Sequence, residues 1–193
     1  MTTEFALIRH GETAWNASGR LQGSTDVPLS DLGIEQAKKL AFELRDTVWD
    51  VIISSPLQRA YQTAVHIVNE LGLDESEIVT NPEFRERSYG QAEGLTTAER
   101  EQQFPDGFWP ELEPKEELNA RIAAALYDLV EVHGGKKILV VAHGGWIRGA
   151  LRIASDFDPK IIHRNIPNTS RTDISHDGEK WHVDAVGQVA HLD

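Results

Sequence analysis

Short apolar runs alternate with amphipathic stretches along most of this chain. Three runs, at residues 5–8, 51–53 and 138–141, contain only apolar side chains. Short, uninterrupted runs of this kind are typical of strands that are buried on both faces in a parallel sheet. The pattern therefore predicts a sheet with layers packed on both of its sides.

The stretches between these runs predict helices. A first helix is expected from Ser30, a good N-cap residue, to about residue 45, with apolar side chains three and four positions apart. A second helix is expected to begin at Ser55-Pro56, with the serine as its cap and the proline in its first turn. Two more are expected over about 115–132 and 145–153. Strands that alternate with helices predict an α/β fold, a three-layer αβα sandwich with a mostly parallel sheet.

Two segments depart from this alternation. The dipeptide Asp177-Gly178 separates the strand-like runs 172–175 and 180–183, which predicts a hairpin and an antiparallel strand at the sheet edge. Residues 89–114 are rich in glycine, proline and charged residues, and they predict a lid insertion with a short helix near 97–103. We therefore expect one domain over residues 1–193 that carries this lid.

Composition and charge exclude several classes of protein. The chain has no cysteine, so disulfide scaffolds, thiolate metal sites and iron–sulfur clusters are excluded. A net charge of −12 argues against general binding to nucleic acid or to anionic membranes. No apolar run approaches the ~20 residues that a membrane helix needs, and no signal peptide is visible. The expected location is cytoplasmic.

Basic side chains follow the end of each of the three predicted strands. Arg9 and His10 follow the first, Arg59 comes shortly after the second, and His143 follows the third. Because ligands bind beyond the carboxyl ends of parallel strands, these side chains are expected to meet at one rim of the sheet. Arginine suits phosphate oxygens, and histidine can act as a nucleophile or an acid–base group. The set predicts a pocket for a phosphoryl group.

Two glycines extend this prediction. Gly11 follows the first basic pair and would let the backbone approach an anion closely. Gly144 precedes the last predicted helix, whose first N–H groups would also favour an anion. The remaining histidines show no metal-ligand spacing, and no metal site is expected: His66, His133, His163, His176, His182 and His191.

Four ordered blocks of sequence resemble the signature of the histidine phosphatase superfamily, the group that includes cofactor-dependent phosphoglycerate mutases. They span residues 4 to about 150 in the order of the family, so the resemblance covers most of the chain. The blocks are Leu7–Thr13 with Trp15-Asn16 and Gln22-Gly23, Ser54–Ala64, Phe84–Gly90 with Glu93-Gly94, and Val141–Gly145 with Ile147-Arg148.

The resemblance implies a role for each matching residue. His10 would attack phosphorus and form a phosphohistidine, while Arg9, Arg59 and His143 would hold the phosphoryl oxygens. Glu86 would protonate the leaving oxygen and then activate the hydrolytic water. Because the cationic side chains supply charge stabilisation, no metal is required. Further contacts to phosphate or substrate are expected from Thr13, Asn16, Gln22, Gly23, Tyr89 and Gly144.

Two activities can begin from the same phosphohistidine, because water as acceptor gives a phosphatase and a bound phosphoglycerate gives a mutase. Tyr89 fits the substrate tyrosine of the mutases, but Thr97 stands where they carry a lysine, and their paired lid arginines have no evident counterpart. The resemblance thus favours a phosphatase of small phosphorylated metabolites, with a 2,3-bisphosphoglycerate-dependent mutase as the alternative. An anionic cofactor would meet a run of lid acids: Glu111, Glu113, Glu116 and Glu117.

Several of these residues also allow other interpretations. Arg87 is equally well explained by a surface ion pair, and Arg148 and Arg152 by pairing on a helix or at an interface. A non-catalytic module that binds phosphorylated ligands is a remote alternative, because both His10 and Glu86 are present. Serine-hydrolase and P-loop signatures are absent. The sequence favours neither a monomer nor a homodimer.

Overall fold

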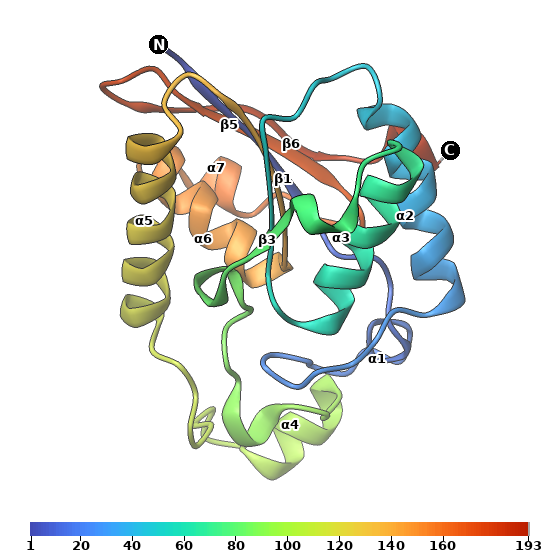
Figure 1. Cartoon of the computed structure of the whole chain (residues 1–193). Helices are drawn as coiled ribbons and strands as arrows, with labels where there is room; N and C mark the ends of the chain where they lie inside the picture. The colour runs from blue at the N-terminus through green and yellow to red at the C-terminus, as the bar shows by residue number, and fades with distance from the viewer. Residues whose placement is uncertain (193) are drawn as a thin grey trace.

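A six-stranded sheet forms the centre of the molecule in the computed structural model, which describes residues 1–192 (Figure 1). The strand order is β3-β2-β4-β1-β5-β6. The first four strands are parallel, and β5 is antiparallel to both β1 and β6. The predicted α/β class, with a mostly parallel sheet and an antiparallel edge strand, is therefore confirmed. The strands are β1 (Thr3–Arg9), β2 (Val51–Ser54), β3 (Ile78–Thr80), β4 (Lys137–Ala142), β5 (Arg171–His176) and β6 (Trp181–Gln188).

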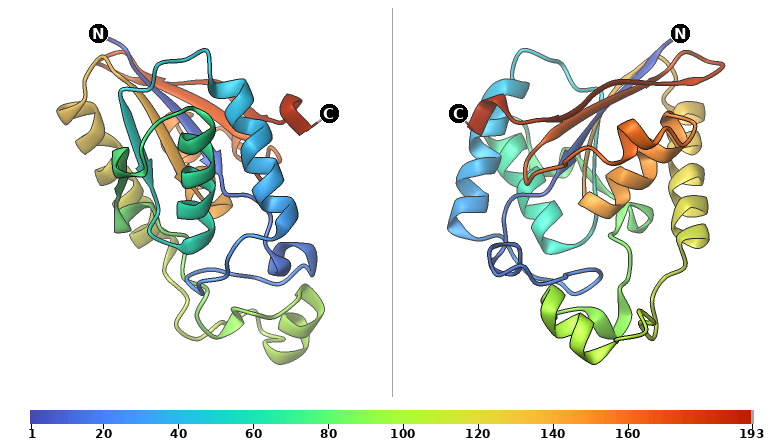
Figure 2. Two further views of the ribbon diagram at one scale, coloured as in Figure 1. Left: turned by 45° about the vertical axis from the view of Figure 1, so that its right-hand side comes forward. Right: turned by 180° about the vertical axis from the view of Figure 1, so that it is seen from behind.

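Helices pack on both faces of this sheet (Figure 2). Alternation of side chains along β1 sends Ala6 and Ile8 toward one layer, and Phe5 and Leu7 toward the other. Within the described residues, no helix has the length and apolar character that crossing a membrane requires. The first layer contains α2 (Asp31–Leu44) and α3 (Gln58–Glu70), and the second contains α5 (Lys115–Val132) and α6 (Gly144–Ala154).

The helix boundaries test the sequence predictions directly. The Ser30 side chain accepts the Gly33 N–H at 3.1 Å, so α2 has its predicted cap. The second helix begins later than predicted, because α3 has Leu57 as its N-cap and no side-chain cap bond. The Ser55 hydroxyl lies 2.8 Å from Nε2 of His143 instead. The expected Ser-Pro helix start is wrong by two residues: the Ser55 hydroxyl oxygen accepts the Leu57 N–H at 3.3 Å, ahead of the first helical turn.

The hairpin and the smaller elements complete the chain. The antiparallel pair β5–β6 confirms the predicted hairpin, with β6 at the edge and β5 beside β1. The strand β3 escaped prediction because only Ile78 of its three residues is buried. The short elements are α1 (Ala14–Ala17), η1 (Glu75–Glu77), η2 (Pro82–Phe84), η3 (Gly90–Ala92), α7 (Pro159–Ile162) and η4 (Ala190–Leu192).

The segment around the predicted lid lies beyond the carboxyl ends of the parallel strands, at the bottom of Figure 1. It contains α4 (Thr97–Gln103), the short helix expected there. Glu93 ties this segment to the loop after α1, because its carboxylate accepts N–H groups from Ser24, Thr25 and Tyr89. The Gly94 N–H also donates to the Leu21 carbonyl at 2.7 Å. The lid is thus bonded to the rim that carries the basic residues.

Candidate active site

His10 lies directly after β1 with its ring held in one orientation. Nδ1 is 2.7 Å from the carbonyl oxygen of Gly11. A carbonyl only accepts, so Nδ1 carries the proton and Nε2 keeps a free lone pair. Burial, followed by the charges of Arg59 and Arg9, lowers the pKa of His10 well below 6.5. A neutral imidazole with a free Nε2 has the state that nucleophilic attack requires.

Two buried guanidinium groups accompany this ring. Arg59 donates from its two terminal nitrogens to the carbonyls of Gly23 and Thr25, at 2.7 and 2.8 Å. Arg9 donates to the carbonyl of Ile166 at 2.8 Å. In the described part of the chain, the Nε atoms of both arginines are buried without a hydrogen-bond partner. Because unpaired buried N–H groups are costly, this arrangement favours an oxygen-rich anion beside them.

His143 packs beside the first histidine. The two ring centroids are 5.1 Å apart. Burial, followed by the charges of Arg59 and His10, lowers the pKa of His143 well below 6.5. When the Ser55 hydroxyl donates to Nε2, the ring proton sits on Nδ1, a buried atom without a partner in residues 1–192. His143 does not line the cavity beside His10, and the fixed positive charge of that cavity comes from its arginines.

Glu86 is clamped by the start of α6. Its Oε2 accepts the Gly145 N–H at 2.9 Å, and its Oε1 accepts the Trp146 N–H at 3.1 Å. A Cβ on Gly145 would collide with this carboxylate, so the glycine makes the approach possible. The expectation that this helix terminus holds a substrate anion is corrected, because two of its N–H groups hold Glu86. Gly144 still lines the cavity.

A buried ion pair fixes the backbone around Glu86. Arg121, on α5, pairs with Glu113 at 2.7 Å, and their side chains are only 9 % and 11 % exposed. The same guanidinium donates to the carbonyls of Glu83, Arg85 and Glu86 at 2.9, 2.9 and 3.2 Å. Sequence reasoning missed Arg121, because the carbonyls and the carboxylate it joins lie on segments far apart in the chain.

The secondary site residues divide into two groups. A cavity of about 410 Å³ beside His10 is lined by five of the residues expected to bind phosphate or substrate: Asn16, Gln22, Gly23, Tyr89 and Gly144. Thr13 is absent from this lining; it is fully buried and accepts the Asn16 N–H as the cap of α1. Gly11 packs against Gly33 of α2, where a Cβ would not fit. The predicted approach of Gly11 to an anion is therefore replaced by helix packing.

Asn168 is a site residue that sequence reasoning missed. Its side-chain amide donates to the carbonyl oxygen of His10 at 2.9 Å and to Oδ1 of Asn16 at 3.2 Å. The Asn16 oxygen also accepts the backbone N–H of Thr13, so its own amide N–H groups remain for the cavity. The signal was weak, because Asn168 lies in a loop before β5, far in sequence from the residues it orients.

The cavity lining carries further positive charge besides Arg9 and Arg59. It includes Arg87, Lys115, Arg148 and Arg152, here called the distal cationic cluster. Among the described residues that line the cavity, Glu86 is the one carboxylate. The expectation of an acidic lid around the ligand is therefore wrong. Of the four acids predicted there, Glu113 pairs with Arg121, and three are exposed outside the lining: Glu111, Glu116 and Glu117.

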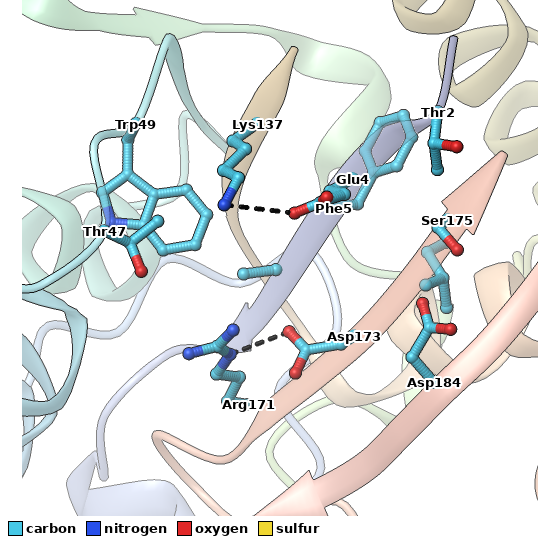
Figure 3. A pocket seen from close by; sticks show the side chains of 12 residues that line it. Thr2, Glu4, Phe5, Thr47, Trp49, Lys137, Arg171, Asp173, Ser175 and Asp184 are labelled. Atoms are coloured by element: carbon cyan, nitrogen blue, oxygen red, sulfur yellow. Dashed lines mark hydrogen bonds and ion pairs between the residues drawn. The ribbon is translucent and has the colours of Figure 1, made fainter. Parts of the chain in front are cut away.

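A second cavity, of about 330 Å³, lies over the first half of β1 (Figure 3). Its cations are paired, with Lys137 3.5 Å from Glu4 and Arg171 2.8 Å from Asp173. It contains none of the predicted site residues. Elsewhere in residues 1–192, no group of three or more histidines and carboxylates is placed to hold a metal ion.

An α/β fold with a neutral histidine close to two arginines at one rim of the sheet fits the class of phosphatases and mutases. A family model of the histidine phosphatase superfamily (branch 1) matches residues 5–189. The chain belongs to this superfamily, as the ordered blocks of its sequence predicted.

Relatives of nearly the same length include proteins named as phosphatases and proteins named as phosphoglycerate mutases. The chain is 39 % identical to the uncharacterized phosphatase PhoE of Bacillus subtilis, over 98 % of this chain and 97 % of that one. It is 37 % identical to the probable phosphoglycerate mutase GpmB of Yersinia pestis, over 97 % and 94 % of the two chains. The solved structure of YhfR from Bacillus stearothermophilus superposes with a TM-score of 0.89 at 29 % identity, covering 99 % of this chain and 100 % of that one.

Proposed function

We propose that this protein is a phosphatase that hydrolyses small phosphate monoesters through a phosphohistidine on His10, without a metal. The observation that carries the proposal is the state of His10, whose Nε2 is unprotonated and free beside the unpaired Nε groups of Arg9 and Arg59. The relatives named as phosphatases support the same class of reaction.

The first step transfers the phosphoryl group to the protein. Nε2 of His10 attacks phosphorus, the N–P bond forms, and the ester P–O bond breaks in line with it. Arg9, Arg59 and His143 donate to the oxygens on which negative charge develops. Glu86, which lines the same cavity, enters this step as the carboxylic acid and gives its proton to the leaving oxygen, so the alcohol departs neutral and Glu86 is left as the carboxylate.

The second step returns the protein to its starting state. Water enters the place of the alcohol and gives a proton to the Glu86 carboxylate as its oxygen attacks phosphorus. The N–P bond breaks, inorganic phosphate leaves, and His10 is neutral again with its proton on Nδ1. The arginines provide the charge that a metal would otherwise supply, so turnover should survive EDTA.

The intermediate is the feature to test first. Wild-type protein is mixed with excess p-nitrophenyl phosphate and quenched in alkali, in which a phosphohistidine persists, and the digested peptides are analysed by mass spectrometry. We expect phosphate on the peptide that contains His10, and none in His10→Ala. Turnover with no phosphorylated histidine would overturn the proposed mechanism.

One observation favours a second function. The distal cationic cluster could hold the acidic group of a phosphoglycerate acceptor, as a 2,3-bisphosphoglycerate-dependent mutase requires. A product assay on 3-phosphoglycerate, with and without 2,3-bisphosphoglycerate, separates the two activities. Release of phosphate without isomerisation supports the phosphatase, whereas rapid formation of 2-phosphoglycerate with little phosphate establishes the mutase.

A further inference from the structure

The short turn η4 (Ala190–Leu192) connects two parts of the molecule that lie far apart in the sequence. It packs against α2 (Figure 2). The side chain of His191 in this turn is only 3 % exposed, and both of its ring nitrogens have partners. Nδ1 lies 3.0 Å from Oε2 of Glu43 on α2, and Nε2 lies 3.2 Å from the hydroxyl oxygen of Thr169. His191 therefore bridges α2 and the loop before β5.

The neighbours of His191 decide which nitrogen of its ring carries the proton. Burial lowers the pKa of His191 below 6.5, and Glu43 opposes this shift, so the ring is neutral at pH 7.5. Because a carboxylate only accepts, Nδ1 carries the proton and Nε2 is an acceptor for the Thr169 hydroxyl. That hydroxyl oxygen is also 2.8 Å from the carbonyl oxygen of Asn168, so its proton faces two acceptors. The contact thus includes the backbone of the loop.

Thr169 has a strained backbone that its surroundings must hold. Its φ is 54°, in the left-handed region that β-branched residues rarely adopt. The residue is fully buried, and its N–H donates to the carbonyls of Arg9 and His10 at 3.0 and 3.3 Å. A conformation of this kind persists only where several contacts enforce it. Within residues 1–192, the ring of His191 is the one side chain that bonds to the Thr169 hydroxyl.

The residue before Thr169 acts on the nucleophile. The amide nitrogen of Asn168 lies 2.9 Å from the carbonyl oxygen of His10 and 3.2 Å from that of Gly11. The Gly11 carbonyl is the acceptor that holds the Nδ1–H of His10. A shift of the backbone at 168–169 would withdraw the Asn168 amide from both carbonyls. The ring of His10 would then lose the fixed orientation that leaves Nε2 free.

We infer that His191 is a positioning residue for His10, which acts through Thr169 and Asn168 from outside the active cavity. The inference rests on the proposed phosphatase activity for its effect on rates. His191 does not line the cavity beside His10, so its loss should leave the contacts to the phosphoryl group in place. The guanidinium groups of Arg9 and Arg59 have carbonyl partners of their own. The effect is therefore expected in kcat and much less in KM.

Kinetics of matched variants test this role. His191→Phe keeps a buried ring and removes both bonds, whereas His191→Gln keeps one donor and one acceptor. With p-nitrophenyl phosphate, we expect kcat to fall about tenfold in His191→Phe while KM changes less than about twofold. His191→Gln should recover part of the loss, because its amide can bond to Glu43 and Thr169. An unchanged kcat in His191→Phe would overturn the inference.

A second histidine–carboxylate pair provides the control. His182 lies 2.7 Å from Asp177 in the hairpin of β5 and β6, and His182→Gln breaks this pair. Its kcat should stay at the wild-type value, because neither residue contacts the loop that carries Asn168. If His182→Gln lowers kcat as much as His191→Phe does, the assignment to His191 is wrong.

Nitrogen NMR of the histidine rings measures the state of His10 without turnover. Two-bond proton–nitrogen spectra distinguish a ring nitrogen that carries a proton from one with a lone pair, and the His10 signals are those missing in His10→Ala. We expect a single form with the proton on Nδ1 in the wild type, and a mixture of both tautomers in His191→Phe. Thr169→Val, which keeps the β-branched shape and removes the hydroxyl, should show the same mixture. Unchanged His10 signals in both variants would reject the inference.

The two measurements separate this inference from the proposed activity. Mixed His10 tautomers in His191→Phe, with no turnover in the wild type, would reject the phosphatase and retain the positioning role. Turnover in the wild type, with the same kcat and the same His10 signals in His191→Phe, would do the reverse. Urea denaturation shows whether each variant is folded. If His191→Phe does not fold, Thr169→Val and His191→Gln carry the same comparison, and wild-type kcat and His10 signals in both would overturn the inference.

Discussion

Two of the cavities of this protein, the one beside His10 and the one over the first half of β1, use the same kinds of charged residue in opposite ways. In the cavity over the first half of β1, Lys137 and Arg171 are each paired with a carboxylate of the chain (Figure 3). In the cavity at the carboxyl ends of the strands, Arg9 and Arg59 keep unpaired, buried Nε groups. The distal cationic cluster has no carboxylate partner among the described residues either.

This difference shows which observation distinguishes the candidate anion site from the other cavity. Both cavities contain cations, and the paired cavity is nearly as large, at about 330 Å³ against 410 Å³. A cation that already binds a carboxylate gains little from a second anion, because its field is largely cancelled. An unpaired, buried guanidinium retains its full interaction with an incoming phosphate. Pairing, more than the number of basic residues, therefore separates the two regions.

The largest effect is expected at the nucleophile. His10→Ala should lower kcat by about 10³-fold or more, because the N–P bond cannot form. Ser175→Ala, in the paired cavity, should leave kcat unchanged. Steady-state rates with p-nitrophenyl phosphate measure both. Comparable losses in the two variants would show that the distinction between the cavities is wrong.

The glycines at the start of α6 give a sharper test of Glu86. Gly145→Ala should lower kcat about 10²-fold, because its Cβ would displace the Glu86 carboxylate. Gly144→Ala is the matched control, since its Cβ would make only ordinary contacts, with Arg9 Nε at 3.6 Å. We expect a much smaller loss for it. Similar losses for both substitutions would argue against a requirement for the exact position of the Glu86 carboxylate.

The buried ion pair behind the active cavity should matter for stability. Arg121→Gln leaves Glu113 and several backbone carbonyls without their donors. We expect the free energy of unfolding to fall by about 2 kcal/mol, and kcat to fall as well because the Glu86 segment loses its support. Urea denaturation measures the first and initial rates the second. Unchanged activity would show that Arg121 acts only on stability.

Stability should also depend on pH through the histidines of the active cavity. The folded-state pKa of His10 and that of His143 lie well below 6.5, so the unfolded chain takes up protons first as pH falls. Folding stability is therefore present above about pH 6.5 and decreases below it. The urea midpoint should fall from pH 7.5 to 5.5, and by less in His10→Ala. An equal fall in both proteins would contradict the assigned neutral state.

The smallest effect is expected in the paired cavity. Lys137→Gln breaks an exposed pair, with side chains 49 % and 55 % exposed, so the free energy of unfolding should change by less than about 1 kcal/mol. The rate with p-nitrophenyl phosphate should stay at the wild-type value. A large loss of activity would mean that a residue of this cavity affects the reaction in the other one. The distinction between the two cavities would then be wrong.

Local pattern predicted a large part of the fold. The helix over 115–132, the lid helix over 97–103 and the Ser30 cap appear where the spacing of apolar and capping residues placed them. The hairpin of β5 and β6 followed from its Asp-Gly turn. Such features depend on residues that are neighbours in sequence, so sequence alone specifies them. The Ser55 cap was not found: the helix begins two residues later, and the contact of the Ser55 hydroxyl with His143, far away in the chain, was not predictable from local pattern.

The sequence by itself determined which chemical groups meet at the rim. Arg9 is the last residue of β1, and His10 and His143 come directly after β1 and β4, which are parallel neighbours and so end at the same edge of the sheet. Tertiary structure alone decided which charged side chains line the cavity without a partner of opposite charge. Glu113 is neutralised by Arg121 on another element, while Arg148 and Arg152 turn into the cavity without such a partner. Coulomb interactions depend on distance in space, and the position of each charged side chain relative to the cavity is set by how the elements pack. Whether the cavity presents positive or negative charge to a bound molecule could therefore be decided only from the folded protein.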